Sequence, residues 1–368
     1  MPGYQKVQFI GHAINTGCKP LKNGEYDYVG LEVPKDDVAE RIKLVKAVLN
    51  LAKGHAKVQQ NNKDVLKVLV LPEFFFRGKV GAYLLGTPET VALISELQKA
   101  VKDADWANWF FVFGTALGMS ALTSADIEKT IAKESQDAKA AKKPYDEAAR
   151  RKELSKFTAY NFALCQGGGF GDGKDAGPNN AHAVTKELKS RIDFIHDSVK
   201  DPNFWLKGRY GLLHEQVEHM PAANVTQSEV QSKSYGGEGI FTHDGFKWGV
   251  EICLDHLSGR LAASNPLPSD IKLQVVPSCG ASIDGNHIVV KNGYVFNCDG
   301  LNRAGRKPTA ANDAHTELQK VNGATRTPVD PVATVTLAGQ VNAVQVDKIF
   351  AAGPGELHIY DALPLNVT

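Results

Sequence analysis

Two residues with reactive side chains each follow a strand-like run of the sequence. The apolar run Val65–Leu71 is followed by Pro72 and then Glu73, and a second run, residues 246–252, ends at Cys253. A thiol attacks a carbonyl carbon strongly once a neighbouring base has taken its proton. Three phenylalanines follow Glu73, and apolar surroundings raise the pKa of a carboxylate, which makes it a proton acceptor near neutral pH. The two strand ends therefore predict one site in which an acid and a thiol act together.

The elements that position these residues are indicated by the spacing of apolar residues along the chain. Strands are predicted at residues 6–14, 65–71, 109–115, 158–165, 239–242, 246–253, 273–277, 294–297, 332–337 and 356–360. Helices are predicted at residues 36–51 and 87–103, the second opening with Thr-Pro-Glu, which is typical of a helix start. No internal repeat or linker divides the sequence. We expect a single domain over residues 1–368.

Two segments interrupt this pattern and are interpreted as insertions. Residues 120–156 are rich in Ala, Lys, Glu and Asp, a composition that predicts a solvated helix or helical hairpin. Residues 193–235 are polar, with scattered aromatic residues and prolines, and predict a long loop that lines or covers a site.

The composition limits the class of protein. The chain has 42 Lys and Arg against 41 Asp and Glu, so it lacks the basic field that dominates nucleic-acid binding. No apolar run approaches membrane-spanning length, and the first ten residues lack the apolar stretch of a secretory signal. The five cysteines are scattered, without a CxxC pair or a His/Cys metal spacing. We expect a cytoplasmic globular protein with no nucleic-acid or membrane partner and no metal.

Motifs in a fixed order give this sequence a family resemblance. Leu-Pro-Glu at residues 71–73, a lysine after a strand and a Gly-rich turn, and Gly-Val-Glu-Ile-Cys-Leu-Asp at residues 249–255 resemble the nitrilase superfamily of carbon-nitrogen hydrolases. The similarity extends over nearly the whole chain. It implies a four-layer α-β-β-α sandwich of the nitrilase type, no cofactor, and a homodimer or higher homo-oligomer.

The resemblance also implies a catalytic Glu-Lys-Cys triad, with Glu73 as the general base and Cys253 as the nucleophile. The register of the family pattern selects Lys186 as the lysine, and Lys189 is the alternative. An ammonium from the lysine and the backbone N–H of Leu254 suit the negative charge that forms on a carbonyl oxygen under attack. The family also has a supporting glutamate, for which Glu215, Glu218 and Glu229 are candidates.

The implied function is hydrolysis of a non-peptide amide through a thioester on the cysteine. The substrate would be a small-molecule amide or nitrile. The sequence Cys-Trp-Glu of nitrile-hydrolysing members is absent, since Leu254 and Asp255 follow the cysteine, which favours an amide. Alternatives are nitrile hydrolysis or acyl transfer to an amine on the same triad, and an inactive binding or scaffold protein that uses residues 120–156 as its contact surface.

Other polar residues near these motifs have less specific interpretations. Glu251 shares the face of Cys253 by strand alternation, and we interpret it as a structural carboxylate. Arg77 either orients an acidic substrate or forms a surface ion pair. The residues interpreted as structural or core side chains are His256, His287, Cys279 and Cys298.

Overall fold

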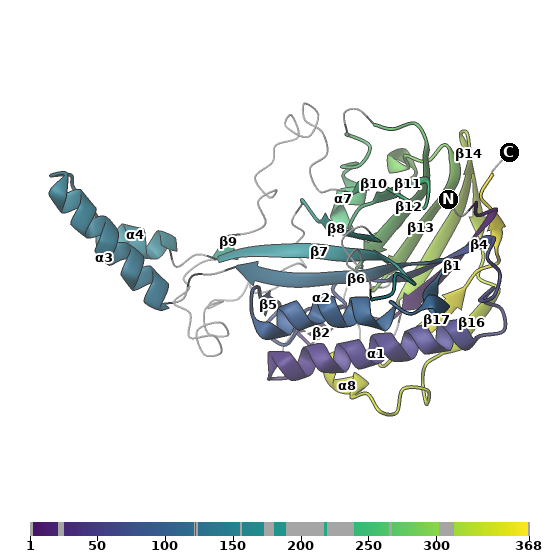
Figure 1. The fold of residues 1–368 in the computed structure, drawn as a ribbon, viewed down its shortest axis with the longest axis horizontal. Helices are drawn as coiled ribbons and strands as arrows, with labels where there is room; N and C mark the ends of the chain where they lie inside the picture. The colour runs from purple at the N-terminus through teal and green to yellow at the C-terminus, as the bar shows by residue number, and fades with distance from the viewer. Residues whose placement is uncertain are drawn as a thin grey trace.

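The computed structural model describes residues 3–20, 26–120, 122, 124–154, 157–172, 180–188, 217–218, 239–264, 267–301 and 313–366. Within them, two β-sheets pack face to face (Figure 1). The first sheet has the strand order β16 (Ala333–Thr336), β17 (Glu356–Ile359), β1 (Lys6–Ala13), β4 (Val65–Leu71), β6 (Trp109–Ser120), β7 (Phe157–Gly167) and β8 (Ala181–Thr185). Short strands extend it: β18 (Leu363–Pro364), β5 (Tyr83–Leu84) and β9 (Val217–Glu218).

The second sheet runs β10 (Ile240–His243), β11 (Phe246–Val250), β12 (Ile271–Ser278), β13 (Asn292–Asp299), β14 (His315–Asn322) and β15 (Thr325–Val329). Strands β11, β12 and β13 are parallel, and the remaining neighbours in this sheet are antiparallel. A separate pair joins β2 (Lys19–Pro20) to β3 (Tyr26–Asp27).

Strand β4 shows how the layers form. All of its residues are buried, and apart from Lys67 they are apolar on both faces rather than alternating with polar residues. Val68 and Val70 belong to the apolar core between the two sheets, together with Trp248 of β11. Leu69 and Leu71 belong to the core on the opposite face of the sheet, beneath the helices.

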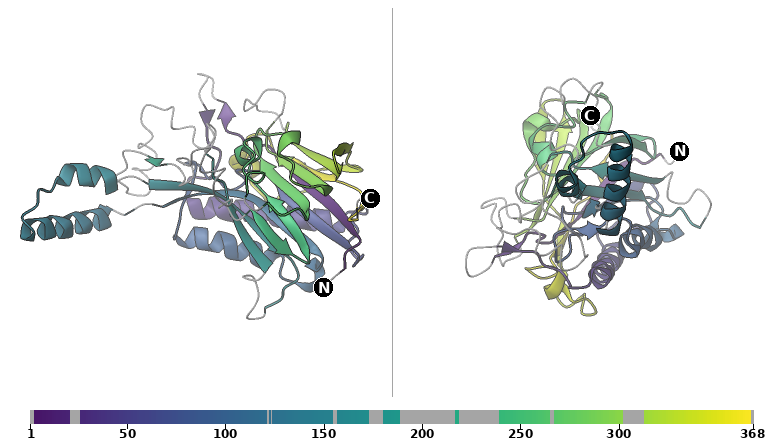
Figure 2. Two further views of the ribbon diagram at one scale, coloured as in Figure 1. Left: turned by 90° about the horizontal axis from the view of Figure 1, so that it is seen from above. Right: turned by 90° about the vertical axis from the view of Figure 1, so that its left-hand side faces the viewer.

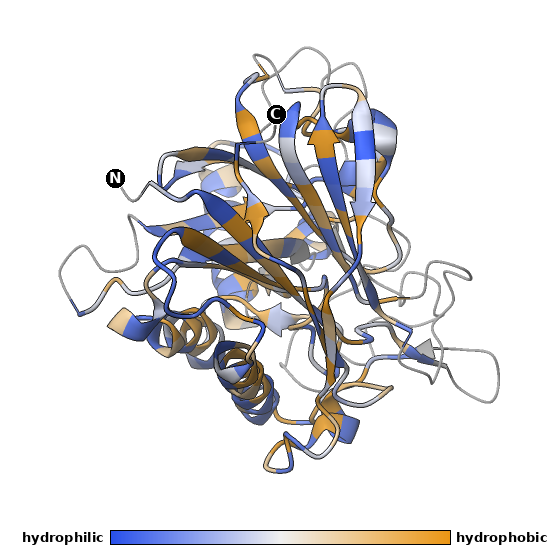
Figure 3. Ribbon diagram, turned by 90° about the vertical axis from the view of Figure 1, so that its right-hand side faces the viewer, coloured by the Kyte–Doolittle hydropathy of each residue, from blue (hydrophilic) through white to orange (hydrophobic). Residues whose placement is uncertain are grey.

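Two helices cover the outer face of the first sheet, as Figures 1 and 3 show. These are α1 (Pro34–Gly54) and α2 (Pro88–Ala100). Both begin with a proline in the first turn, where its missing N–H does not cost a helical hydrogen bond. The apolar stripe of α1 packs with β4 and β6 in one core cluster, as the sequence spacing predicted. In α2 the apolar residues of that cluster are Leu93 and Leu97, whereas Val91 and Ile94, which the apolar spacing placed on the same stripe as Leu97, are exposed.

The outer face of the second sheet is covered differently. The described segments that pack there are the turn after the short helix α7 (Leu254–Leu257), through Leu261, and the loop between β12 and β13, through Ile283 and Val289. The loop contains the 3-10 helix Gly285–His287. The expected α/β sandwich is confirmed, with a thin outer layer on this side among the described residues. The other short helices in the described part of the chain are the 3-10 helix Ala104–Trp106 and α8 (Val346–Ile349).

The segment predicted as a solvated helical hairpin projects from the sandwich (Figure 2). Helices α3 (Ser124–Ala140) and α4 (Glu147–Leu154) lie between β6 and β7. Ion pairs between the helices join Arg150 to Glu134 and Arg151 to Glu128. None of the helices in the described ranges is long and apolar enough to cross a membrane.

A bulge in β6 connects this fold to the site. The pairing of β6 with β7 shifts register between Val112 and Thr115, and Gly114 there has a φ of 65°. A Cβ atom added to Gly114 would lie 2.3 Å from the carbonyl oxygen of Pro72. The bulge also brings Thr115 Oγ1 within 2.9 Å of the N–H of Phe74, which donates to it. Bulges commonly direct a side chain in this way next to an active site.

We therefore expect Gly114→Ala to lower the free energy of unfolding by about 2 to 4 kcal/mol, because it combines a left-handed backbone with a steric clash. Urea unfolding followed by circular dichroism measures the change. Gly54→Ala is the control, since a Cβ there meets no atom within 4 Å and should be neutral or slightly stabilising. Equal stabilities for the two variants would contradict this account of the bulge.

Candidate active site

Glu73 lies at the end of β4, where the first sheet approaches the second. Its side chain is fully buried. Its N–H donates to the carbonyl oxygen of Ser278 at 3.2 Å, so the end of β12 in the other sheet holds it. Phe74 has a φ of 62°, a strained conformation for a bulky residue, and Thr115 fixes this turn through the hydrogen bond described above.

Cys253 is also held by the end of β12, through the carbonyl next to the one that binds Glu73. Its N–H donates to the carbonyl oxygen of Pro277 at 3.2 Å. It lies three residues beyond β11, immediately before α7, with a φ of 49°. Consecutive carbonyls at the end of β12 thus receive the acid's backbone and the thiol's backbone. The Cys253 Sγ itself lies 3.9 Å from the carbonyl oxygen of Cys279.

Lys186 follows β8 at the edge of the first sheet. Its Nζ lies 2.9 Å from Glu73 Oε1, and both side chains are fully buried. Its N–H donates to the carbonyl oxygen of Asn161 in β7 at 2.8 Å. The acid and the lysine selected from the family register, 113 residues apart in sequence, therefore form one buried ion pair.

Asn161 is a site residue that the sequence reasoning missed. Its Nδ2 donates to Glu73 Oε1 at 2.8 Å, while its carbonyl holds the backbone of Lys186. The signal in the sequence was an amide between the apolar residues of the strand, at the same alternation as Ala163 and Cys165. These two residues belong to the core between the sheets. A buried amide is retained where it has hydrogen-bond partners.

The charges around Cys253 control its thiol. Burial raises the pKa of the Cys253 thiol well above its usual range, the negative charge of Glu73 raises it further, and Lys186 lowers it. A hydrogen bond between the thiol and the Glu73 side chain acts in the same direction as the Glu73 charge. The resting thiol is therefore protonated at neutral pH, and its reaction needs a base at contact distance.

The structure describes only some of the other residues that the sequence predicted for the site. Leu254 opens α7, and none of the backbone hydrogen bonds between described residues outside helices and strands uses its N–H. Lys189, Glu215 and Glu229 lie outside the described residues, and Glu218 is described only as backbone, in β9.

Arg77 is buried, so the surface ion pair considered for it is wrong. Its guanidinium lies 3.5 Å from the centroid of the Phe74 ring, and Nη1 lies 3.2 Å from Cys18 Sγ. Lys186 Nζ lies 5.7 Å from the same Phe74 ring centroid. Phe75 and Phe76, which were expected to surround the carboxylate, instead belong to the core beneath the helices.

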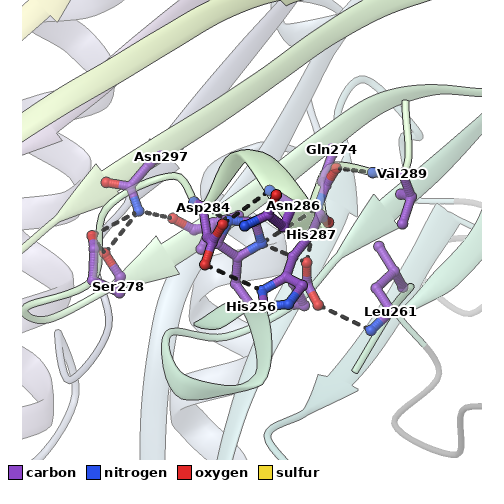
Figure 4. A network of polar contacts seen from close by, with 12 residues as sticks. His256, Leu261, Gln274, Ser278, Asp284, Asn286, His287, Val289 and Asn297 are labelled. Carbon is purple, nitrogen blue, oxygen red and sulfur yellow. Dashed lines mark hydrogen bonds and ion pairs between the residues drawn. The ribbon is translucent and has the colours of Figure 1, made fainter. Parts of the chain in front are cut away.

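Glu251 belongs to a separate buried network around α7, seen in Figure 4 through His256 and Gln274. Glu251 Oε1 lies 2.7 Å from His256 Nδ1 and accepts from Gln274 Nε2 at 2.8 Å. The N–H of Asp284 donates to His256 Nε2 at 2.9 Å, which places the ring proton on Nδ1. The network joins the turn after Cys253 to the loop that covers it, in agreement with a structural carboxylate.

A further buried carboxylate, Asp299 at the end of β13, binds the backbone just after Cys279. Its Oδ1 accepts from the N–H groups of Gly280 and Leu301, at 2.6 and 2.9 Å. Burial raises the pKa of Asp299 to about 7, and the charge of Glu73 adds to this shift. In the unfolded chain the pKa of an aspartate is about 3.9.

This difference predicts a pH-dependent stability. Between pH 4 and 7 the folded protein binds more protons at Asp299 than the unfolded chain, so stability falls as pH rises through this range, by up to about 4 kcal/mol. Asp299→Asn keeps an acceptor and should remove this fall. Urea unfolding at pH 5 and pH 8 should show the variant gaining relative to the unsubstituted protein at pH 8. The exposed Asp270→Asn is the control, and the same difference at both pH values would contradict the prediction.

Comparisons with known proteins give matches to solved structures only. No protein-family model matches the sequence, and no curated protein matches it. An amidase from Nesterenkonia sp. AN1, in complex with butyramide, is 9% identical with a TM-score of 0.36, over 99% of this chain and 92% of the amidase. A CN-hydrolase superfamily protein from Xanthomonas campestris is 10% identical with a TM-score of 0.36, over 88% and 86% of the two chains. A glutamine-dependent NAD+ synthetase from Acinetobacter baumannii is 10% identical with a TM-score of 0.36, over 88% of this chain and 44% of the synthetase.

The family resemblance therefore rests on features of this chain itself. The motifs at residues 71–73 and 249–255 end strands of two facing sheets, and their acid and thiol meet a lysine from a third segment. The order of these motifs resembles that of the nitrilase superfamily, and the structure places them on two facing sheets.

Proposed function

We propose that the chain is a cysteine-dependent hydrolase of a non-peptide amide, acting through a thioester on Cys253. The observation that carries this proposal is the buried contact of 2.9 Å between Lys186 Nζ and Glu73 Oε1, beside a thiol whose pKa responds to both. A cation, a base and a nucleophile from three distant segments are the groups that acyl transfer requires.

In the first half-reaction Glu73 takes the proton from Cys253 Sγ as the sulfur attacks the carbonyl carbon. The C–S bond forms and the carbonyl π electrons move to oxygen. The ammonium of Lys186 and the N–H of Leu254 stabilise the resulting oxyanion. When the intermediate collapses, the C–N bond breaks and Glu73 returns the proton to the departing nitrogen, which leaves as an amine or ammonia.

The second half-reaction uses the same groups. Glu73 takes a proton from water, whose oxygen attacks the thioester carbonyl, and the C–S bond breaks as the carboxylic acid forms. The proton returns to the thiolate, so one amide and one water give one acid and one amine. Catalysis needs no redox step and no further reactant.

The burial of Cys253, which is 4% exposed, favours a small substrate over a folded polypeptide. By analogy with the family, we propose a cytoplasmic homo-oligomer. Nitrile hydrolysis would use the same triad, but the residues after Cys253 lack the Trp-Glu pair of nitrile-hydrolysing relatives. Acyl transfer to an amine differs only in what attacks the thioester.

Cys253→Ala should reduce turnover of a competent amide to background while the circular dichroism spectrum is retained, because the attacking atom is removed. Cys165→Ala is the matched control, since Cys165 in β7 is also a buried thiol of the core between the sheets, but the pKa of its thiol is raised by burial rather than by the charge of Glu73. It should lose stability without losing activity. Retained turnover in the Cys253 variant would reject the mechanism, and uniform labelling of all five cysteines by a thiol probe would favour an inactive scaffold.

A thioester intermediate should be visible by mass spectrometry after mixing with a small library of amides, nitriles and N-carbamoyl compounds. We expect an acyl adduct on Cys253 that water removes. Adding hydroxylamine at increasing concentration separates the alternatives: a hydrolase gives mainly acid at low amine, whereas an acyltransferase gives mainly the amine adduct and little acid. An adduct on another cysteine would contradict the assignment.

A further inference from the structure

The lysine and the cysteine of the proposed site come from different sheets. Lys186 follows β8 at the edge of the first sheet, and Cys253 follows β11 in the second. The ammonium can act on the oxyanion only if these two ends keep a fixed separation, and an edge segment is held by fewer neighbours than a central strand. A direct tie between the two ends would meet this requirement.

Asp255 provides such a tie. Its carboxylate is fully buried and accepts two hydrogen bonds from the backbone just beyond the lysine. The N–H of Glu187 donates to Oδ2 at 2.8 Å, and the N–H of Leu188 donates to Oδ1 at 2.7 Å. Hydrogen bonds to an ionised carboxylate are among the stronger ones in proteins, and buried geometry of this kind is specific.

A second contact supports the same connection. The carboxylate of Glu187 forms an ion pair with the guanidinium of Arg260, and both side chains are almost completely buried. Arg260 in turn donates its N–H to the carbonyl oxygen of Asp255 at 3.0 Å. The segment after Lys186 is therefore attached to the turn after Cys253 through its backbone and through a side chain.

We propose that Asp255 is a positioning residue, which holds Lys186 at the distance from Cys253 that the reaction needs. The inference rests on the proposed function. Asp255 lies two residues after the thiol, and the first N–H that it accepts lies one residue after the lysine. We call the two hydrogen bonds from Glu187 and Leu188 to Asp255 the clamp. If the clamp shifts, the Lys186 ammonium moves relative to both the Cys253 thiol and Glu73, with little effect on the rest of either sheet.

Asp255→Asn is the sharpest test, because its size is unchanged. In the variant one side-chain oxygen still accepts a backbone hydrogen bond. The amide NH2 that replaces the other oxygen is a donor and faces a backbone N–H, so one of the two hydrogen bonds is lost. We expect kcat to fall by about 100-fold, as for a displacement of about 1 Å, with KM nearly unchanged. The pH dependence of iodoacetamide alkylation at Cys253 should also shift, because the distance of Lys186 affects the thiol.

Glu40→Gln is the matched control. Glu40 is a buried carboxylate of α1 that accepts a backbone N–H from the distant Gln345, remote from the cysteine. Its variant should lose stability while kcat and the alkylation profile stay as in the unsubstituted protein. If Asp255→Asn does not fold, Asp255→Glu, which keeps the charge but displaces it, is measured in the same way.

The outcomes separate the two proposals. If the unsubstituted protein hydrolyses no amide and Cys253 forms no adduct, the proposed function fails. If the unsubstituted protein is active and a folded Asp255 variant keeps its kcat and its alkylation profile, the positioning role is overturned. A lower kcat with a shifted alkylation profile, absent from the Glu40 variant, supports it.

Discussion

The buried ion pair between Glu73 and Lys186 sets the conditions that the rest of the structure meets. Removing two charges from water costs several kcal/mol for each ion, and their attraction offsets this only with good geometry and further hydrogen bonds. Here Asn161 supplies one of those bonds, at 2.8 Å from the same carboxylate oxygen. The pair is thus weak evidence for stability, but it keeps a carboxylate and an ammonium in a buried site, where electrostatic interactions are stronger than in water.

The separation between the Glu73 carboxylate and the Cys253 thiol depends on the end of β12. The carbonyls of Pro277 and Ser278 receive the N–H groups of Cys253 and Glu73, so one rigid strand end sets the separation of the thiol and the acid. Both Cys253 and Phe74 have positive φ values, which cost of order 1 to 3 kcal/mol each. Strain of this kind persists only where surrounding contacts determine the conformation, as the hydrogen bonds to β12 and to Thr115 do here.

The sequence predicted the parts of this arrangement that repeat or end sharply. Strand β4 and the stripe of α1 follow from apolar spacing, and Glu73 and Cys253 follow strand ends. The stripe predicted for α2 is only partly buried, because Val91 and Ile94 are exposed. Asn161 and Asp255 were not assigned to the site because their partners lie in segments far along the chain. Strands β14 and β15 were also missed. They have few buried residues, so the pairing of β14 with β13 and of β15 with β14, rather than an apolar pattern, makes them strands.

The long sequence separations in the site have a simple structural origin. Residues between Glu73 and Lys186 include the projecting hairpin α3–α4, which lies between the end of β6 and the start of β7. The pairing continues to the insertion point, with Ser120 opposite Thr158. Asn161 lies only three residues further into β7, and it still forms its hydrogen bonds to Glu73 and to the backbone of Lys186. A helical hairpin at the tip of a paired ladder lengthens the chain without changing the register, because each preceding pair is already fixed by its own hydrogen bonds.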